Sequence, residues 1–230
     1  WMYKLPKDMS AKLNVLVEPM TTAARAFERA FAPGIPAFSE GFGPAKTVVI
    51  QGAGAIGTLS AAVAKISGAK KVIMVGAPAN RLKIAEKFGV DETINIEQVT
   101  KPEERIEIVK KLIHESQGPD VVVEATGVPA AVPEGLAMVR PGGIFVEVGH
   151  FVDTGATSIS PFILCSKDIN LYGSYGYSEY DYETAIHLLY YNRDSFPFEQ
   201  LVTHEFPLTQ AEKAVLAAER GEALKAAIVP

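Results

Sequence analysis

The chain has 230 residues and a formal net charge of −5, with 48% hydrophobic and 21% charged residues. This composition excludes a disordered chain and supports one or two globular domains. The acidic balance argues against nucleic-acid binding, and every apolar run is well short of the roughly 20 residues of a membrane helix. A single cysteine excludes a disulfide framework and a site with several cysteine ligands. It is typical of a reducing compartment, so we expect a cytoplasmic protein.

Short apolar runs alternate with amphipathic segments from residue 47 onward. The strands predicted in chain order are 47–51, 71–75, 92–95, 120–125, 144–148 and 169–172, and the helices between them are 56–67, 80–88, 102–116 and 129–139. Continuous apolar strands that alternate with helices indicate a parallel sheet covered on both sides. The predicted fold class is therefore α/β, a Rossmann doubly wound parallel six-stranded sheet with helices on both faces.

The two ends of the chain depart from this alternation. The segments expected there are a helix over 23–31, a loop over 33–46, helices over 182–191 and 210–220, and strands over 201–206 and 225–229. The chain begins Trp1-Met2-Tyr3, without an initiator methionine at position 1. We take this start as a sign that the sequence is a piece of a longer protein.

A glycine-rich motif follows the first predicted strand and opens a helix. The run Gly52-Ala53-Gly54-Ala55-Ile56-Gly57 fits G-x-G-x-x-G in the context that makes the pattern specific for dinucleotides. Gly52 would permit a tight turn, Gly54 a close approach to a pyrophosphate, and Gly57 close packing of helix on sheet. The helix start, with Ala55 and Ile56, would offer free N–H groups to the phosphates.

The end of the second predicted strand lacks the acidic residue of most Rossmann sites. Gly76 stands where Asp or Glu usually binds the adenosine ribose. No carboxylate would repel a 2′-phosphate, so NADP is not excluded on charge grounds. Arg81 is the nearest cation, about one helical turn further on. It would contact the ribose or a 2′-phosphate, or be an ordinary solvated helix residue.

Further motifs lie along the whole chain. They are Arg81-Leu82, Gly89-Val90-Asp91, the run 120–127, Pro141-Gly142-Gly143, Gly149, and at the flanks Glu18-Pro19-Met20-Thr21-Thr22, the run 201–204 and the run 224–229. Together with residues 48–57, they resemble the medium-chain, zinc-dependent alcohol dehydrogenase superfamily. The Cys and Gly-His-Glu zinc motif of that family's N-terminal domain is not in this sequence.

The resemblance implies three parts. Residues 1–28 would be the trailing segment of the catalytic domain with its connecting helix, and 29–175 the Rossmann dinucleotide-binding domain. Residues 176–230 would be the C-terminal return of the catalytic domain. The chain would thus be the cofactor half of an enzyme with both of its edges.

The resemblance also implies a nicotinamide site at the carboxyl ends of the strands, where ligands bind in open α/β sheets. The matching positions are Thr22, Thr126, Val148, Gly149, His150, Ser174, Gly176 and Lys225. Thr22 would touch the nicotinamide, and Thr126 would lie beside the adenine and ribose. His150 is left open between a substrate-pocket residue and a partly exposed loop residue. Lys225 would reach the pyrophosphate, or be a surface lysine.

Glu18 matches a position that supplies an acidic ligand or near-ligand to the catalytic zinc, so it is the candidate catalytic and metal-binding residue. The alternative is a boundary or helix-cap residue. The cofactor implied is NAD, because Pro78 stands where phosphate-binding branches tend to place Arg; NADP stays open. Zinc is implied for the full-length protein.

The resemblance implies hydride transfer between an alcohol or ketone and the nicotinamide, in a zinc-dependent alcohol or polyol dehydrogenase. The isolated chain, without most of the zinc ligands, is expected to be inactive. Two alternatives stay open: a zinc-free, quinone-reductase-like oxidoreductase, and a non-catalytic NAD(P)-binding module.

We also expect a homodimer or homotetramer, formed through a sheet-edge strand near Thr157–Ser160. Cys165, in an apolar run, is expected to be a small buried residue.

Overall fold

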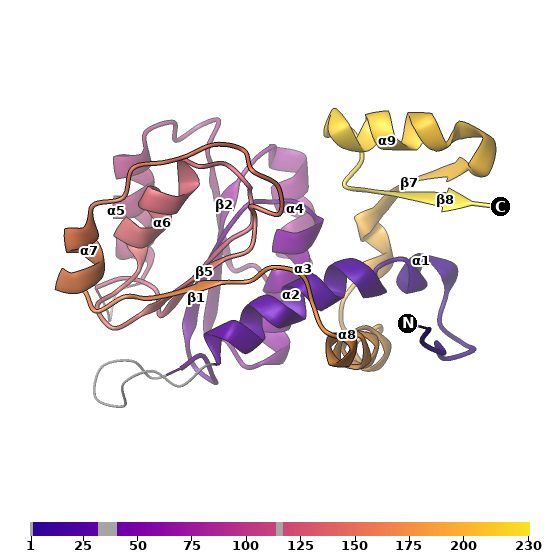
Figure 1. Ribbon diagram of the computed structural model, residues 1–230, viewed down its shortest axis with the longest axis horizontal. Helices are drawn as coiled ribbons and strands as arrows, with labels where there is room; N and C mark the ends of the chain where they lie inside the picture. The colour runs from indigo at the N-terminus through magenta and orange to yellow at the C-terminus, as the bar shows by residue number, and fades with distance from the viewer. Residues whose placement is uncertain (1, 32–40, 114–116) are drawn as a thin grey trace.

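A six-stranded parallel sheet forms the centre of the computed structural model, which describes residues 2–31, 41–113 and 117–230 (Figure 1). Its strands are β1 (Thr47–Gln51), β2 (Lys71–Gly76), β3 (Glu92–Asn95), β4 (Val121–Glu124), β5 (Ile144–Glu147) and β6 (Asn170–Gly173). They lie in the order β3-β2-β1-β4-β5-β6, and all neighbours are parallel. This is the doubly wound Rossmann order, so the predicted fold is confirmed.

Helices bury both faces of this sheet. Val48 and Ile50 of β1 belong to one apolar cluster and Val49 to the other, because successive strand side chains point to opposite faces. The helices that pack on the sheet in the first cluster include α2 (Val17–Ala30), α3 (Ala55–Ile66) and α4 (Ala79–Glu86). Those of the second are α5 (Pro102–Leu112), α6 (Ala131–Met138) and α7 (Pro161–Ser166). Every residue of β1 is buried, as expected for a strand covered on both faces.

The remaining elements lie beside the sheet. They are α1 (Ala11–Asn14), α8 (Glu179–Tyr191), η1 (Phe198–Leu201), β7 (Val202–Pro207), η2 (Leu208–Gln210), α9 (Ala211–Glu219) and β8 (Lys225–Val229). Strands β7 and β8 pair with each other, and α9 packs on both of them, to the right of the sheet in Figure 1. Helix α2 packs on both α3 and α8, and thus connects the outer elements to the sheet.

Several predicted boundaries are corrected. Helix α2 begins at Val17 rather than at residue 23, because Pro19 lies in its first turn, where proline is tolerated. Helix α5 ends at Leu112, and residues 114–116 of its predicted range lie outside the described residues, as do 33–40 of the predicted loop. No helix in the described ranges is both long and apolar enough to cross a membrane.

Two expectations about the segment before β6 are wrong. Residues 157–160 form no strand; Ser160 is the N-cap of α7, which begins at Pro161 and was not predicted. Strand β6 itself is the edge of the sheet. Cys165 is exposed rather than buried, because α7 turns Ile163 and Leu164 toward the second apolar cluster instead.

Asp120 joins the starts of two neighbouring strands to the turn before β5. Its carboxylate accepts hydrogen bonds from the N–H of Thr47 at 2.8 Å, from the Thr47 hydroxyl at 2.9 Å and from Arg140 Nε at 2.8 Å. Burial would raise the pKa of Asp120, but these bonds outweigh it and hold the pKa below its usual value.

We expect Asp120→Asn to lower the free energy of unfolding by about 1–3 kcal/mol at neutral pH, the usual cost of losing hydrogen bonds to a charge. Because the folded-state pKa is depressed, this contribution is present above the unfolded pKa and is lost as pH falls below about 4. Urea unfolding of both proteins at pH 7 and pH 3 measures the difference. Asp194→Asn, at an exposed carboxylate, is the control. An Asp120→Asn deficit of equal size at both pH values would contradict this account.

Candidate functional site

The glycine turn between β1 and α3 is built by close backbone packing. Gly52 has a φ of +111°, and a Cβ there would lie 2.8 Å from the carbonyl oxygen of Ala125. A Cβ on Gly57 would lie 1.9 Å from the carbonyl oxygen of Gly52, so only glycine lets α3 approach the turn so closely. By contrast, a Cβ on Gly54 would meet nothing within 4 Å. The space in front of this helix is therefore open.

The start of α3 is suited to binding an anion. Gly54 is the N-cap, and no side chain caps the helix. The first N–H groups of a helix have no partner within it, and they carry the positive end of the helix dipole. An open space facing an uncapped helix N-terminus is the arrangement that binds phosphate groups.

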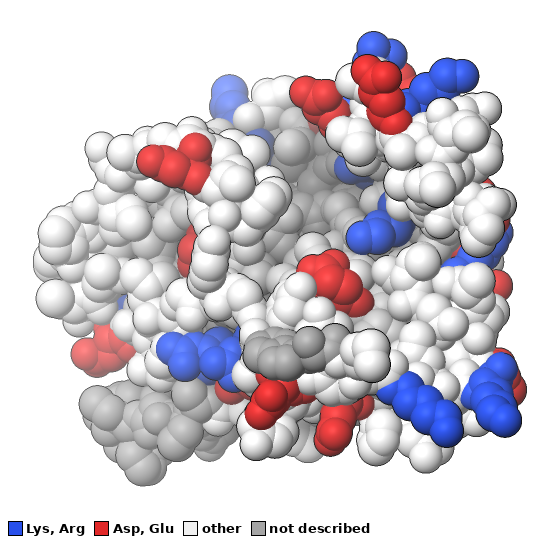
Figure 2. Space-filling model, turned by 45° about the vertical axis from the view of Figure 1, so that its right-hand side comes forward, with Lys and Arg blue, Asp and Glu red and all other residues white. Residues whose placement is uncertain are grey.

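Two neighbouring cavities lie along this edge of the sheet. The first, the glycine-loop cavity, has a volume of about 370 Å³, and its lining includes Gly52, Gly54, Gly76, Arg81 and Thr126. The second, the Glu18 cavity, has a volume of about 470 Å³, and its lining includes Glu18, Thr22, Ile56, Thr126, Val148, Gly149, Ser174 and Gly176. Both include Ala125 and Thr126, so they adjoin at the end of β4. Figure 2 shows a deep hollow in the face it presents, with basic side chains on one wall.

One residue in the lining of each cavity carries a buried polar atom without a partner. Ser174 Oγ in the Glu18 cavity and Gln51 Oε1 in the glycine-loop cavity find no hydrogen-bond partner among the described residues. Orphaned buried polar atoms carry a desolvation cost that a ligand would relieve. The open space at Gly54, in front of an uncapped helix start, fits an anionic group of a ligand.

Arg81 lies in the wall of the glycine-loop cavity, but its guanidinium is engaged elsewhere. It donates to the carbonyl oxygens of Gly221 at 2.6 Å and Ala223 at 3.4 Å, and so links α4 to the turn before β8. Gly76 is closely packed as well, since a Cβ there would lie 2.9 Å from the backbone nitrogen of Ala53. An acidic side chain at position 76 would require this turn to shift.

A buried ion pair in the same cavity was not predicted. Arg105 donates to both carboxylate oxygens of Glu134, at 2.7 and 2.6 Å, and also to the carbonyl oxygens of Val99 and Thr100. The bidentate geometry joins α5 to α6 behind the cavity. The sequence carries a sign of this burial, because Arg105 lies four residues before the buried Val109 and therefore on the same, apolar side of the helix.

Glu18 lies at an exposed position on α2, in the wall of its cavity. Tyr177 donates a hydrogen bond to Glu18 Oε1 at 3.1 Å. A hydrogen bond with Tyr182, burial and the Glu18 carboxylate all raise the pKa of Tyr177, so this hydroxyl keeps its proton.

Zinc is bound in proteins by three or four side-chain ligands. Glu18 is the single candidate ligand that the described chain offers at this cavity. These residues therefore do not fit a zinc ion by themselves.

The remaining predicted residues do not line the two cavities. His150 lines a third cavity, beside β6, and its Nδ1 lies 2.9 Å from Glu147 Oε1. Lys225 starts β8 and is not among the described residues that line either cavity. Ala55 and Gly57 belong to the α3 start but line neither, so their contribution is to the helix backbone.

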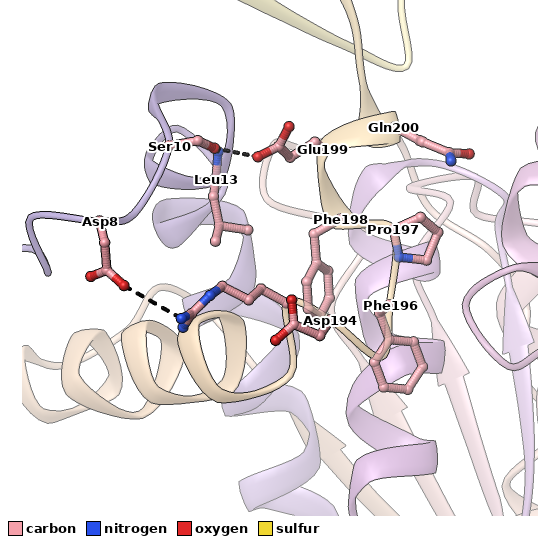
Figure 3. Close-up of a pocket in the computed structure, with 10 residues that line it drawn as sticks. Asp8, Ser10, Leu13, Asp194, Phe196, Pro197, Phe198, Glu199 and Gln200 are labelled. Carbon is pink, nitrogen blue, oxygen red and sulfur yellow. Dashed lines mark hydrogen bonds and ion pairs between the residues drawn. The ribbon is translucent and has the colours of Figure 1, made fainter.

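A fourth cavity lies at a joint between the two ends of the chain (Figure 3). Arg193 Nη2 lies 3.4 Å from Asp8 Oδ2, and the Ser10 hydroxyl donates to Glu199. Leu13 and Phe198, which also line this cavity, are buried. Its contacts thus hold the segment before α2 against the turn after α8.

The family described as zinc-binding dehydrogenase matches residues 55–190. D-xylulose reductase of Scheffersomyces stipitis is 35% identical over 93% of this chain and 56% of that protein. Erythritol/L-threitol dehydrogenase of Mycolicibacterium smegmatis is 32% identical over 99% of this chain and 58% of that protein.

The crystal structure of an alcohol dehydrogenase from Thermotoga maritima superposes with a TM-score of 0.87 at 30% identity, over 99% of this chain and 60% of that one. The chain thus spans a little over half the length of the proteins it matches. The open helix start, the doubly wound sheet and these similarities agree: the chain belongs to the medium-chain, zinc-dependent alcohol dehydrogenase superfamily.

Proposed function

We propose that this chain is the cofactor-binding part of an NAD-dependent alcohol or polyol dehydrogenase. The observation that carries the proposal is the open space at Gly54, in front of an uncapped helix and between two adjoining cavities. A nicotinamide dinucleotide is a long ligand with an anionic centre, which matches two cavities on either side of a helix N-terminus.

In this proposal the pyrophosphate lies at Gly52, Gly54 and the α3 start. The adenosine half occupies the glycine-loop cavity beside Gly76, and Thr126 lies between the two halves. The nicotinamide half occupies the Glu18 cavity, whose lining is given above, and Ser174 Oγ there supplies a hydrogen-bonding group. When bound, the nicotinamide gives or takes the hydride, and this chain binds and orients it.

The substrate and the metal belong to the proposal for the longer protein. The relatives named above are a xylulose reductase and a tetritol dehydrogenase, which favours a small alcohol or ketone substrate. Glu18 would supply one ligand or near-ligand to zinc, held in place by Tyr177. Because the other ligands are not among the described residues, a non-catalytic NAD(P)-binding module is the second candidate for the chain alone.

We also propose a cytoplasmic homo-oligomer. The free edge of β6 would form the contact, because an unpaired strand edge is a template for pairing with a second copy. Large apolar side chains are exposed there, namely Phe151, Phe162, Leu171 and Tyr175.

Gly54→Val should weaken NADH binding by about tenfold or more, because its side chain would occupy the space that we assign to the pyrophosphate. Fluorescence titration with NADH measures the affinity. The matched control is Gly43→Val, whose Cβ also meets nothing within 4 Å but which lies before the start of β1, at the opposite end of the strand. The proposal fails if Gly54→Val binds NADH as tightly as the parent.

We expect NADH to bind more tightly than NADPH, because Pro78 follows β2 where a phosphate-binding arginine would stand and Arg81 is engaged with Gly221 and Ala223. Arg81→Ala should then change the affinities for NADH and NADPH by similar factors. Parallel titrations of both proteins with both cofactors test this. A selective loss of NADPH binding in Arg81→Ala would instead assign Arg81 to a 2′-phosphate.

A further inference from the structure

Two carboxylates at the ends of β4 and β5 hold the two loops that line the Glu18 cavity. Glu124 Oε1 accepts hydrogen bonds from the N–H of Thr126 at 2.6 Å and from the Thr126 hydroxyl. Glu147 Oε1 accepts from the N–H of Gly149 at 3.0 Å and of His150 at 3.2 Å. Each carboxylate therefore fixes the loop that follows its own strand. Both loops contribute to the lining, through Thr126 and Gly149.

The two carboxylates and His150 form one compact cluster. One carboxylate oxygen of each glutamate and one ring nitrogen of His150 all lie within 4.8 Å of one another. His150 Nδ1 is 2.9 Å from Glu147 Oε1 and 3.5 Å from Glu124 Oε2. A Cβ on Gly149 would lie 2.3 Å from Glu124 Oε2, so the carboxyl group from β4 lies directly under the loop after β5. The cluster joins the loops to each other.

The cluster has one more hydrogen-bond acceptor than the donors around it can satisfy. Glu124 is fully buried, and Glu147 Oε2 is a buried atom with no partner in the described part of the chain. Glu147 is half-buried, with its side chain 24% exposed. A fully buried carboxylate beside a second, half-buried one is costly to keep ionised. Burial, opposed by the Thr126 hydrogen bonds and reinforced by Glu147, raises the pKa of Glu124 to about 7. A proton on Glu124 would give the two carboxylates a hydrogen atom to share.

We propose that Glu124 and Glu147 share one proton, and that this pair, closed by His150, is the positioning device that holds the two cofactor loops together. The shared proton and the positioning of the two loops do not depend on a bound cofactor. The expected effect on cofactor affinity rests on the proposed function.

Four titratable groups face this position: Glu124, Glu147, His150 and, on the exposed side of His150, Asp153. A hydrogen bond from His150 to Glu147 outweighs partial burial and raises the pKa of His150. With the shared proton and a charged imidazole, the glutamate pair and His150 are neutral together. At alkaline pH both protons leave, and two carboxylates repel each other beneath the loops.

The sign of the pH effect follows from these directions. Glu124 and His150 both bind protons more strongly in the folded chain than in the unfolded one. Their contribution to stability is therefore complete below the unfolded pKa of each group. It is lost as pH rises through the folded pKa of each group, which is about 7 for Glu124 and is raised above its usual value for His150. Cofactor affinity should fall over the same range.

Glu124→Gln tests the shared proton, because its amide keeps an acceptor for Thr126 and carries N–H donors toward Glu147 at every pH. From pH 6.5 to 8.5, NADH binding to the parent should weaken by about three- to tenfold. This is the change expected when the bound cofactor shifts the pKa of a titrating group by up to about one unit. Binding to Glu124→Gln should weaken less than binding to the parent over this range, because only His150 still titrates in the variant. Its melting temperature relative to the parent should rise by about 2–4 °C over the same range, equivalent to about 1 kcal/mol.

Two controls separate positioning from general damage. Glu124→Leu removes both hydrogen-bonding functions and should weaken NADH binding at both pH values. Glu107→Gln, an exposed carboxylate on α5, should keep the pH dependence of the parent.

Parallel pH profiles for Glu124→Gln and the parent would overturn the proposal. So would a thermal stabilisation by Zn²⁺ or Mg²⁺ that Glu124→Gln abolishes, since a cation would then take the place of the proton. If the parent fails to bind NADH, the proposed function falls, and the melting temperatures alone still decide whether the proton is shared.

Discussion

The structure depends on the close contact between the glycine turn and the first turn of α3. Gly57 lies against the carbonyl oxygen of Gly52, at a distance that no side chain would tolerate. This contact aims the N-terminus of α3 at the carboxyl edge of the sheet and leaves its N–H groups uncapped. The open space at Gly54 and the two cavities beside it follow from that placement. Without the contact, the helix would move away from the sheet, and the anion site would lose its donors.

The other constraint is the burial of acidic side chains at both ends of the strands. Asp120 connects strand starts at the far end, where its partners outweigh the cost of burial. At the carboxyl end, Glu124 and Glu147 accept hydrogen bonds from backbone N–H groups, but Glu147 Oε2 has no donor among the described residues. The Arg105–Glu134 pair is satisfied by bidentate bonds instead. These buried groups fix the loops around the cavities, which an apolar core alone would leave free to shift.

Local patterns were sufficient for much of the fold. The apolar runs at β1 and β4 and the glycine motif predict the sheet because burial on both faces leaves a continuous hydrophobic signature. Helix α7 and the true start of α2 were missed, since a short helix has few periodic residues and Pro19 reads locally as a break. The strand expected at 157–160 failed because pairing is a long-range property that local β propensity does not determine.

The candidate site also has parts that the sequence predicts and parts that it does not. Backbone positions such as Gly52, Gly54 and Val148 were predictable from the strand ends. Side-chain partnerships across distant elements were not: the Arg105–Glu134 pair joins two helices, and the engagement of Arg81 involves residues about 140 positions away. His150 was placed correctly in its loop, but the neighbouring carboxylate that turns it toward β5 was not predicted. Such contacts depend on tertiary packing.

Hydrogen–deuterium exchange of the chain with and without NADH tests the central claim most directly. Bound NADH should slow amide exchange in the α3 start, at residues 52–58, and in the loops 125–128, 148–150 and 174–176. The β7–β8 pair should exchange as before. Protection confined to the cavity between Asp8 and Gln200, or no change at the α3 start despite measurable binding, would contradict the account.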